Sequence, residues 1–291
     1  MGNLIKAIGK SVLLTLCLVS LVSADAPVWQ IEKNGRLLYL GGTIHLLTPQ
    51  DYPLPTAFEI AYQRASQVVF ETDIGKFKKP EFQRQLLQQL TFSDGRNLQD
   101  IITPETYAAV AEFFSARGMS MRDIDQYKPG MVSILISVIE LQRMGVMAVG
   151  VDDYYSDRAS REQKSIGQLE GLEQQIAFIA NMGKGQEDAM LSYSLADIAR
   201  LPETWRRMTL AWRSGDLEAL EELAGTPLRE QFPRVYQSLL VARNNAWMPQ
   251  IESMAGSPEI ELVLVGALHL AGEDGLLAQL ARRGYLIRQM P

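Results

Sequence analysis

Two stretches that lie far apart in the chain share one pattern: Leu38-Tyr-Leu-Gly-Gly-Thr-Ile-His-Leu46 and Val263-Leu-Val-Gly-Ala-Leu-His-Leu270. Each is an apolar run of the kind that forms a buried strand, and each carries Gly-x-x-His at its end. A predicted helix and a further apolar strand follow each of them, over 54–71 and 273–289. The repeat predicts an α/β fold with a mixed central sheet, built from tandem β–Gly-x-x-His–α–β units at the two ends of the chain.

The segments around the repeats predict the rest of the fold. Asn34-Gly35 separates two apolar stretches and is a strong signal for a two-residue hairpin turn. The strand over 67–71 is expected to lie parallel to the first Gly-x-x-His strand and directly beside it. From about residue 80 to 255 the pattern is mainly helical, with a long helix over 229–254, and no Gly-, Ser- or Pro-rich linker separates it from the rest. We therefore expect one domain with a large helical insertion.

The first 24 residues have the features of a secretory signal peptide. Lys6 and Lys10 precede an uncharged apolar stretch over 12–22, and Ser23-Ala24 supplies small residues at the expected cleavage site. The apolar stretch is shorter than the roughly 20 residues that span a bilayer. We therefore expect a periplasmic or secreted protein whose mature chain, residues 25–291, has no transmembrane segment. An uncleaved anchor is the alternative.

Composition narrows the chemistry that the chain can perform. Its single cysteine, Cys17, lies in the expected signal peptide, so the mature chain has no disulfide, no thiolate nucleophile and no Cys-based metal site. The chain has 34 acidic and 28 basic residues, and it lacks the Lys/Arg cluster that nucleic-acid binding requires. Nucleic acid is therefore excluded as a partner, and catalysis depends on His, carboxylates, hydroxyls or Arg.

The only two histidines, His45 and His269, both follow a predicted strand, at the edge where α/β folds bind ligands. Gly42 and Gly266 are expected to let the backbone turn sharply there. Glu71 ends its own strand and is expected to reach the same edge. Two imidazoles and a carboxylate form a three-ligand metal set with positions open to water and substrate, which suits hydrolysis. Two hydrogen-bonded structural histidines are the alternative.

Three further polar residues are candidates for the same site. Glu170 closes a short strand over 164–169 and is a candidate general base or further ligand, with a helix N-terminal charge as its alternative role. Arg243 is a candidate to hold the substrate or a developing oxyanion, although spacing alone also allows a surface Arg. Asn244 follows it and is a candidate for substrate binding.

Six motifs occur in a fixed order along the chain: Gly42-Thr-Ile-His45, Phe70-Glu71, Gly150-Val-Asp152, Lys164…Leu169-Glu170…Gln175, Arg243-Asn244 and Gly266-Ala-Leu-His269. Over roughly residues 27 to 290 they resemble the TraB/GumN family, which includes the TIKI proteases. The chain departs from the family pattern at Gln168, where relatives usually have Gly, and at Gly130, where Trp is common.

The resemblance implies a metal-dependent hydrolase in which His45, Glu71 and His269 hold the ion. Mn or Co is the metal that it implies, with Zn as an alternative, and peptides are the implied substrate, with small molecules as an alternative. It also implies a fold akin to erythromycin esterases and to the ChaN haem-binding proteins. A ChaN-like protein that binds haem, metal or peptide without turnover, and a metal-free esterase with His45 as base, are the competing hypotheses. No oligomeric state is predicted.

Overall fold

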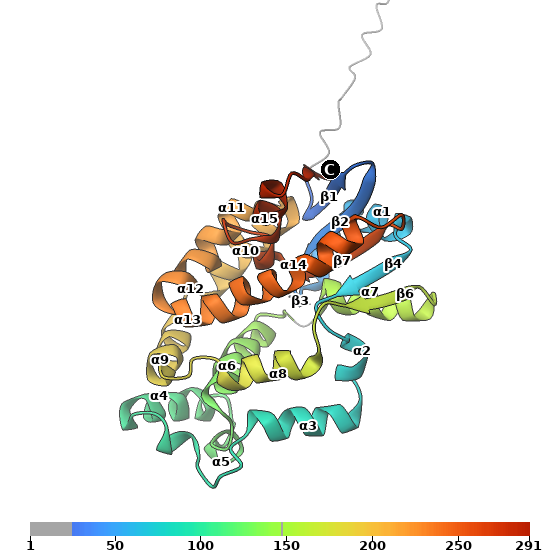
Figure 1. Ribbon diagram of the computed structural model, residues 1–291. Coiled ribbons are helices and arrows are strands. Elements are labelled where there is room, and N and C mark those ends of the chain that lie inside the picture. Colours follow the sequence, from blue (N-terminus) through green and yellow to red (C-terminus); the bar gives the residue numbers. More distant parts are fainter. Residues whose placement is uncertain (1–24, 147) are drawn as a thin grey trace, which may run out of the picture.

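The computed structural model describes residues 25–146 and 148–291, so the expected signal peptide lies outside the described residues. Its centre is a six-stranded mixed sheet with the order β6-β4-β7-β2-β1-β8 (Figure 1). The strands are β1 (Val28–Lys33), β2 (Arg36–Thr43), β4 (Gln67–Phe70), β6 (Ser165–Gln168), β7 (Glu261–Gly266) and β8 (Leu286–Gln289). β6, β4, β7 and β2 run parallel, and β1 is antiparallel to both of its neighbours. The predicted mixed α/β sheet is confirmed.

The predicted hairpin joins β1 to β2. Asn34 and Gly35 have φ angles of 52° and 73°, so both adopt the left-handed conformation that a type I′ turn requires. Lys33 pairs directly with Arg36 across this turn. The turn therefore fixes the register of the strand that leads to the first histidine.

The centre of the sheet differs from the prediction, because β7 lies between β2 and β4. It pairs residues 262–266 with 39–43 on one side and residues 261–264 with 67–70 on the other. The β2–β4 crossover leaves room for one strand, and β7, whose apolar residues are all buried, fills this position. The expectation that the 67–71 strand lies directly beside the first Gly-x-x-His strand is therefore wrong, and its neighbour is the second one.

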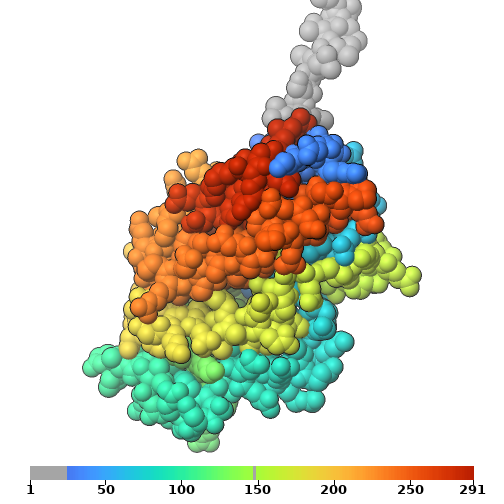
Figure 2. Space-filling model, in the orientation of Figure 1, coloured from blue at the N-terminus to red at the C-terminus, as the bar shows by residue number. Residues whose placement is uncertain are grey.

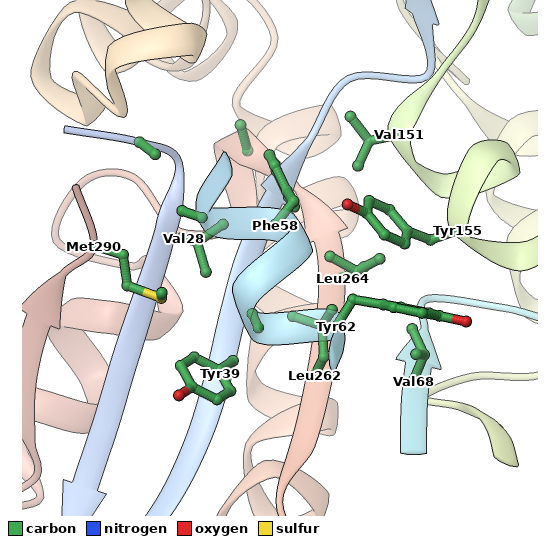
Figure 3. Close-up of a cluster of buried hydrophobic side chains, with 14 of the residues drawn as sticks. Val28, Tyr39, Phe58, Tyr62, Val68, Val151, Tyr155, Leu262, Leu264 and Met290 are labelled. Atoms are coloured by element: carbon green, nitrogen blue, oxygen red, sulfur yellow. The ribbon is translucent and has the colours of Figure 1, made fainter. Parts of the chain in front are cut away.

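Helices cover both faces of the sheet. On one face lie α1 (Thr56–Arg64), α7 (Val151–Arg161) and α10 (Leu201–Ser214), and on the other lie α14 (Ala242–Ala255) and α15 (Leu276–Arg282). Figure 3 shows Phe58 and Tyr62 of α1 beside Tyr155 of α7 and above Leu262 and Leu264 of β7. These side chains are fully or almost fully buried, so the sheet has the rigidity needed to position residues at its edge.

The remaining helices lie between β4 and β7 in the chain, where a helical insertion was expected. They are α2 (Ile74–Phe77), α3 (Pro80–Leu90), α4 (Pro104–Ser115), α5 (Met121–Ile124), α6 (Pro129–Arg143), α8 (Leu172–Asn181), α9 (Glu187–Asp197), α11 (Leu217–Leu220), α12 (Thr226–Gln231) and α13 (Pro233–Tyr236). Helices α3 to α6, α8 and α9 lie beyond the carboxyl ends of β4 and β6, while α11 packs beside α10 (Figure 1). Part of this insertion has a core of its own, around Val110, Phe114 and Ile136. Among the helices of the described residues, none combines the length and the hydropathy of a membrane span.

Two local features, a π-helical turn and a two-stranded ladder, were not predicted, although a bend of the 229–254 helix at Pro233 was allowed for. The helix expected over 229–254 is divided, because the chain breaks at Phe232 before Pro233 and then forms a π-helical turn, η4 (Gln237–Val241), ahead of α14. A two-stranded ladder pairs β3 (Leu46–Leu47) with β5 (Ala148–Val149). Both features lie at the edge where the candidate residues meet, since η4 precedes Arg243 and β3 follows His45.

Candidate functional site

Glu71 lies directly after β4 and is buried at the carboxyl edge of the sheet. Its Oε1 accepts a hydrogen bond from the backbone N–H of Gly266 at 2.7 Å, and its Oε2 accepts one from Nη2 of Arg243 at 2.5 Å. Burial favours the neutral acid, but the His269 imidazole, the Arg243 guanidinium and the Gly266 amide outweigh it and lower the pKa of Glu71 to about 2. The carboxylate is therefore ionised at neutral pH.

His269 is 3% exposed and its hydrogen bonds determine which nitrogen carries the proton. The amide nitrogen of Asn244 donates to the carbonyls of His269 and Asp274, so its Oδ1 must be the acceptor that lies 2.7 Å from Nδ1 of His269. The proton is accordingly on Nδ1, and Nε2 carries a lone pair. Burial lowers the pKa of His269 to about 4, which keeps the ring neutral.

Arg243, at the start of α14, connects three of the candidate residues. It donates to both oxygens of Glu170, from Nε at 3.1 Å and from Nη2 at 2.7 Å, and it also binds Glu71. Its Nη1 lies 3.0 Å from Nε2 of His269, and its guanidinium stacks over the Trp247 ring. One buried cation therefore holds together the residues that follow β4, β6 and β7.

Glu170 is buried and has its hydrogen-bonding capacity taken up inside the protein. Besides the two bonds from Arg243, its Oε2 accepts a bond from the indole N–H of Trp247 at 3.2 Å. In this arrangement Glu170 positions Arg243, and a role as general base would require Arg243 to release it. The structure thus gives the predicted pair a direct contact that the sequence had not specified.

His45 lines the same cavity as His269 but differs from it in exposure, since 67% of its side chain is accessible. Its Nδ1 is 2.8 Å from Oδ2 of Asp152, and Oδ1 of Asp152 accepts a bond from Thr43 at the same distance. The Asp152 carboxylate raises the pKa of His45 above its usual value. Because Nδ1 is taken up by Asp152, Nε2 is the free ring nitrogen of His45.

The opposite shifts of the two imidazoles lead to a testable titration pattern. The chain has only two histidines, so its NMR spectrum contains two Cε1–H resonances to follow against pH. We expect His45 to titrate above pH 6.5 and His269 to titrate near pH 4. In Asp152→Asn the His45 midpoint should move down toward 6.5, because the anionic partner is gone.

Asp153→Asn is the matched control for that titration. Asp153 adjoins Asp152 on α7, but its carboxylate pairs with Lys78 instead of a histidine. It should leave the midpoint of His45 almost unchanged. A wild-type His45 midpoint at or below 6.5, or equal shifts in the two variants, would contradict the assigned pair.

Close packing explains the glycines of the site. A Cβ on Gly150 would overlap the backbone carbonyl of His45, so this glycine lets α7 approach and brings Asp152 to the ring. A Cβ on Gly42 would lie 3.2 Å from Ala267, and one on Gly266 would lie 3.3 Å from Oε1 of Glu71. Gly266 has φ −51° and ψ 136°, which any residue adopts. Neither Gly42 nor Gly266 has a positive φ, so close packing, and not a left-handed conformation, accounts for the glycines before the two histidines.

The structure brings four of the predicted residues to one cavity of about 500 Å³: His45, Glu71, Arg243 and His269. Glu170 and Arg243 also line a hollow of about 720 Å³, and the surface is visibly hollowed between the orange α14 and the yellow helices of the insertion (Figure 2). Asn244 is 1% exposed and lies behind His269. Asn244 therefore orients the imidazole of His269. It is too deeply buried in this arrangement to contact a substrate.

The three expected metal ligands differ in how free their donor atoms are. Each imidazole has the outer hydrogen bond typical of a metal-bound histidine, from Nδ1 to Asp152 or to Asn244. The carboxylate of Glu71, however, is already held by Arg243 and Gly266. Within 25–146 and 148–291, no three His, Asp or Glu side chains stand close enough together to hold an ion as they are. For the expected ligands to meet at one ion, Arg243 would have to release Glu71 and His269.

Two residues of the site were not recognised from the sequence. Asp152 occurs in one of the six motifs, and this was a usable signal, but no role was assigned to it. Trp247 donates to Glu170 and packs against His269 with ring centroids 4.5 Å apart. An indole four residues after Arg243 on a helix gave no signal that distinguishes it from an ordinary core residue.

Comparison with known proteins identifies the family of the chain. The chain matches the TraB/PrgY/gumN family over residues 27–289 and belongs to that family. It is 26% identical to the uncharacterized protein YbaP of Escherichia coli K12, over 84% of this chain and 87% of YbaP, with the same values for YbaP of Shigella flexneri. It is 23% identical to the metalloprotease TIKI1 of Danio rerio, over 91% of this chain and 63% of TIKI1. No solved structure matches the chain significantly, so the expected likeness to erythromycin esterase and ChaN stays a prediction.

Proposed function

We propose that the chain is an exported hydrolase of peptide bonds, with its reaction site at the carboxyl edge of the sheet. The observation that carries the proposal is the pair of imidazoles, His45 and His269, on one cavity beside an ionised Glu71. Both rings are oriented through Nδ1, which leaves Nε2 as the reactive atom. The name of the distant relative TIKI1, a metalloprotease, supports the class of reaction.

His45 and Arg243 have different tasks in this proposal. His45 is paired with Asp152 through Nδ1, so its Nε2 is the ring nitrogen that would bind the proposed cation. Arg243 lines the same cavity as both histidines, and it stabilises negative charge that develops on the carbonyl oxygen. Glu170 positions Arg243 through two hydrogen bonds, and it is the residue that holds the guanidinium when other partners leave.

A divalent cation is the proposed cofactor, Mn or Co with Zn as an alternative, and His45, Glu71 and His269 would hold it. Such an ion supplies a Lewis acid and lowers the pKa of water. His269 is neutral near pH 7 and Glu71 is ionised, so these two ligands need no change of protonation. Binding would require Arg243 to release both Oε2 of Glu71 and Nε2 of His269, while its two bonds to Glu170 could stay.

Metal content and peptide hydrolysis should depend together on the two histidines. We expect elemental analysis of untagged protein to find about one divalent ion per chain, and none in His45→Ala/His269→Ala. Peptide cleavage should stop after chelation and return when Mn or Co is added. Cleavage that survives exhaustive chelation would contradict the metal and favour a metal-free esterase-like reaction.

Binding without turnover is the second candidate, because an apolar cavity with two imidazoles has the chemical character of a haem site. Titration with haem distinguishes the two. A Soret shift that is lost in His45→Ala, together with no cleavage of any peptide, would favour the binding protein.

A further inference from the structure

The cavity that contains both histidines has one polar end and a long apolar wall. The wall is formed by side chains from five elements that pack around the carboxyl edge: Val138 and Leu141 of α6, Phe178 of α8, Met208 of α10, Leu239 of η4, and Leu268 of the short turn η5 (Ala267–His269). Helices α6 and α8 of the insertion supply three of these six side chains. The cavity therefore joins the reactive groups of the sheet to an apolar surface that the sheet alone does not provide.

Most of the apolar side chains in this wall are only partly buried. Val138, Phe178, Met208 and Leu239 are only partly buried, although they lie between the sheet and the insertion and face the cavity. A concave apolar surface that adjoins a few polar groups is the usual form of a ligand pocket. At about 500 Å³ the cavity is within the size range of such pockets and has room for a large side chain.

Two buried polar atoms beside the cavity favour a peptide as the ligand. Oε1 of Gln175 and Oγ1 of Thr72 are buried and find no hydrogen-bond partner in the described part of the chain. Gln175 lines both the apolar cavity and an adjacent hollow of about 410 Å³, which Thr72, His45 and Asp152 also line. Buried polar atoms normally have partners, and an extended peptide offers a backbone N–H and C=O at each residue.

We propose that the apolar cavity is the specificity pocket for a bulky aliphatic or aromatic side chain next to the cleaved bond, and that Gln175 binds the substrate backbone at its mouth. The inference rests on the proposed function, because it names the substrate of the same site. The side chain enters between the sheet and the insertion, while the backbone crosses from the apolar cavity to the adjacent hollow past Gln175. The insertion is then the element that selects substrates.

The test uses peptides Ac-Ala-Ala-X-Ala-Ala-NH₂ that differ only at X, with products identified by mass spectrometry. We expect kcat/KM for Leu, Met or Phe at X to exceed that for Gly or Asp by at least about tenfold, the range in which an apolar pocket discriminates. Val138→Trp fills the cavity and should reduce this ratio by about tenfold. Equal rates for all X, or a preference for Asp, would overturn the pocket.

Leu210→Trp is the matched control for the cavity variant. Leu210 lies on α10 only two residues from Met208, but it is 57% exposed and does not line the cavity. This variant should keep the wild-type ratio. If both Trp variants change the ratio equally, the effect does not arise from filling the cavity and the pocket is rejected.

Gln175→Leu separates binding of the backbone from selection of the side chain. It removes the Oε1 acceptor while keeping a similar shape, so KM should increase about tenfold for every X, because one hydrogen bond is lost. The ranking of X should stay the same. A change in kcat with KM unaltered would contradict the assigned role.

A binding measurement keeps the pocket testable if the wild type cleaves no peptide, in which case the proposed function fails. Saturation-transfer NMR with N-acetyl-L-phenylalaninamide and N-acetylglycinamide needs no turnover. The pocket would be supported independently if only N-acetyl-L-phenylalaninamide binds, and if its binding is weakened in Val138→Trp and kept in Leu210→Trp. Equal signals for the two amides would overturn it.

Discussion

Replacing Arg243 with alanine is expected to lower the free energy of unfolding by about 3–5 kcal/mol, because Glu71 and Glu170 would be left buried without their cation. The side chains of all three residues are at most 12% exposed, so water replaces little of the lost interaction. Urea denaturation of the wild type and of Arg243→Ala measures the difference. Arg243→Lys should fall between them, because an ammonium keeps the charge but cannot bind Glu170 with two parallel hydrogen bonds.

Arg206→Ala is the matched control for that loss. Arg206 also forms an ion pair with a glutamate, Glu203, but both side chains are more than 60% exposed. Its removal should change stability by less than about 1 kcal/mol. If Arg243→Ala is as mild as Arg206→Ala, the central role of the buried guanidinium is refuted.

The second large effect is expected on activity, in His45→Ala. The residues that orient metal ligands are themselves worth about 10–100-fold in activity, so we expect loss of a proposed ligand to reduce kcat/KM for peptide cleavage by at least about 100-fold. The melting temperature should change little, because the ring is largely exposed. Added imidazole should restore part of the activity, since the vacated position opens onto a cavity that small molecules can enter.

Gln50→Ala provides the comparison for that variant, as Gln50 is exposed on the segment that follows His45 and lines none of the hollows described above. It should retain wild-type activity. Full activity of His45→Ala would remove this residue from the reaction. A loss of activity together with a large drop in melting temperature would indicate a structural histidine instead.

Local patterns were sufficient to predict most of the elements. The hairpin followed from Asn34-Gly35, and the strands and most helices followed from apolar periodicity. The carboxyl ends of parallel strands meet at one edge, and this rule alone placed His45, Glu71 and His269 in the same region. Chain connectivity and strand period thus account for the general location of the site.

Strand order could not be predicted in the same way. The residue pairs that place β7 between β2 and β4 are separated by almost 200 residues or more, and nothing in a single apolar run specifies its neighbour. As a consequence, Glu71 accepts a hydrogen bond from Gly266, 195 residues away, and lies beside the second Gly-x-x-His motif.

The hydrogen bonds of the site could not be predicted from the spacing of residues in the sequence either. Arg243 binds Glu71 across 172 residues, and His45 binds Asp152 across 107. Their geometry depends on close approaches, such as that of Gly150 to the backbone of His45. A motif can indicate that such residues matter. Only the three-dimensional structure shows which carboxylate is hydrogen-bonded to which imidazole.

The most direct measurement is anomalous diffraction from crystals of the wild-type protein grown with Mn²⁺. We expect one strong peak within about 2.0–2.3 Å of Nε2 of both His45 and His269, with Arg243 turned away from His269 and still bound to Glu170. Crystals of an active enzyme that show no peak between the two imidazoles, or with the rings bound to separate ions, would contradict a shared hydrolytic centre.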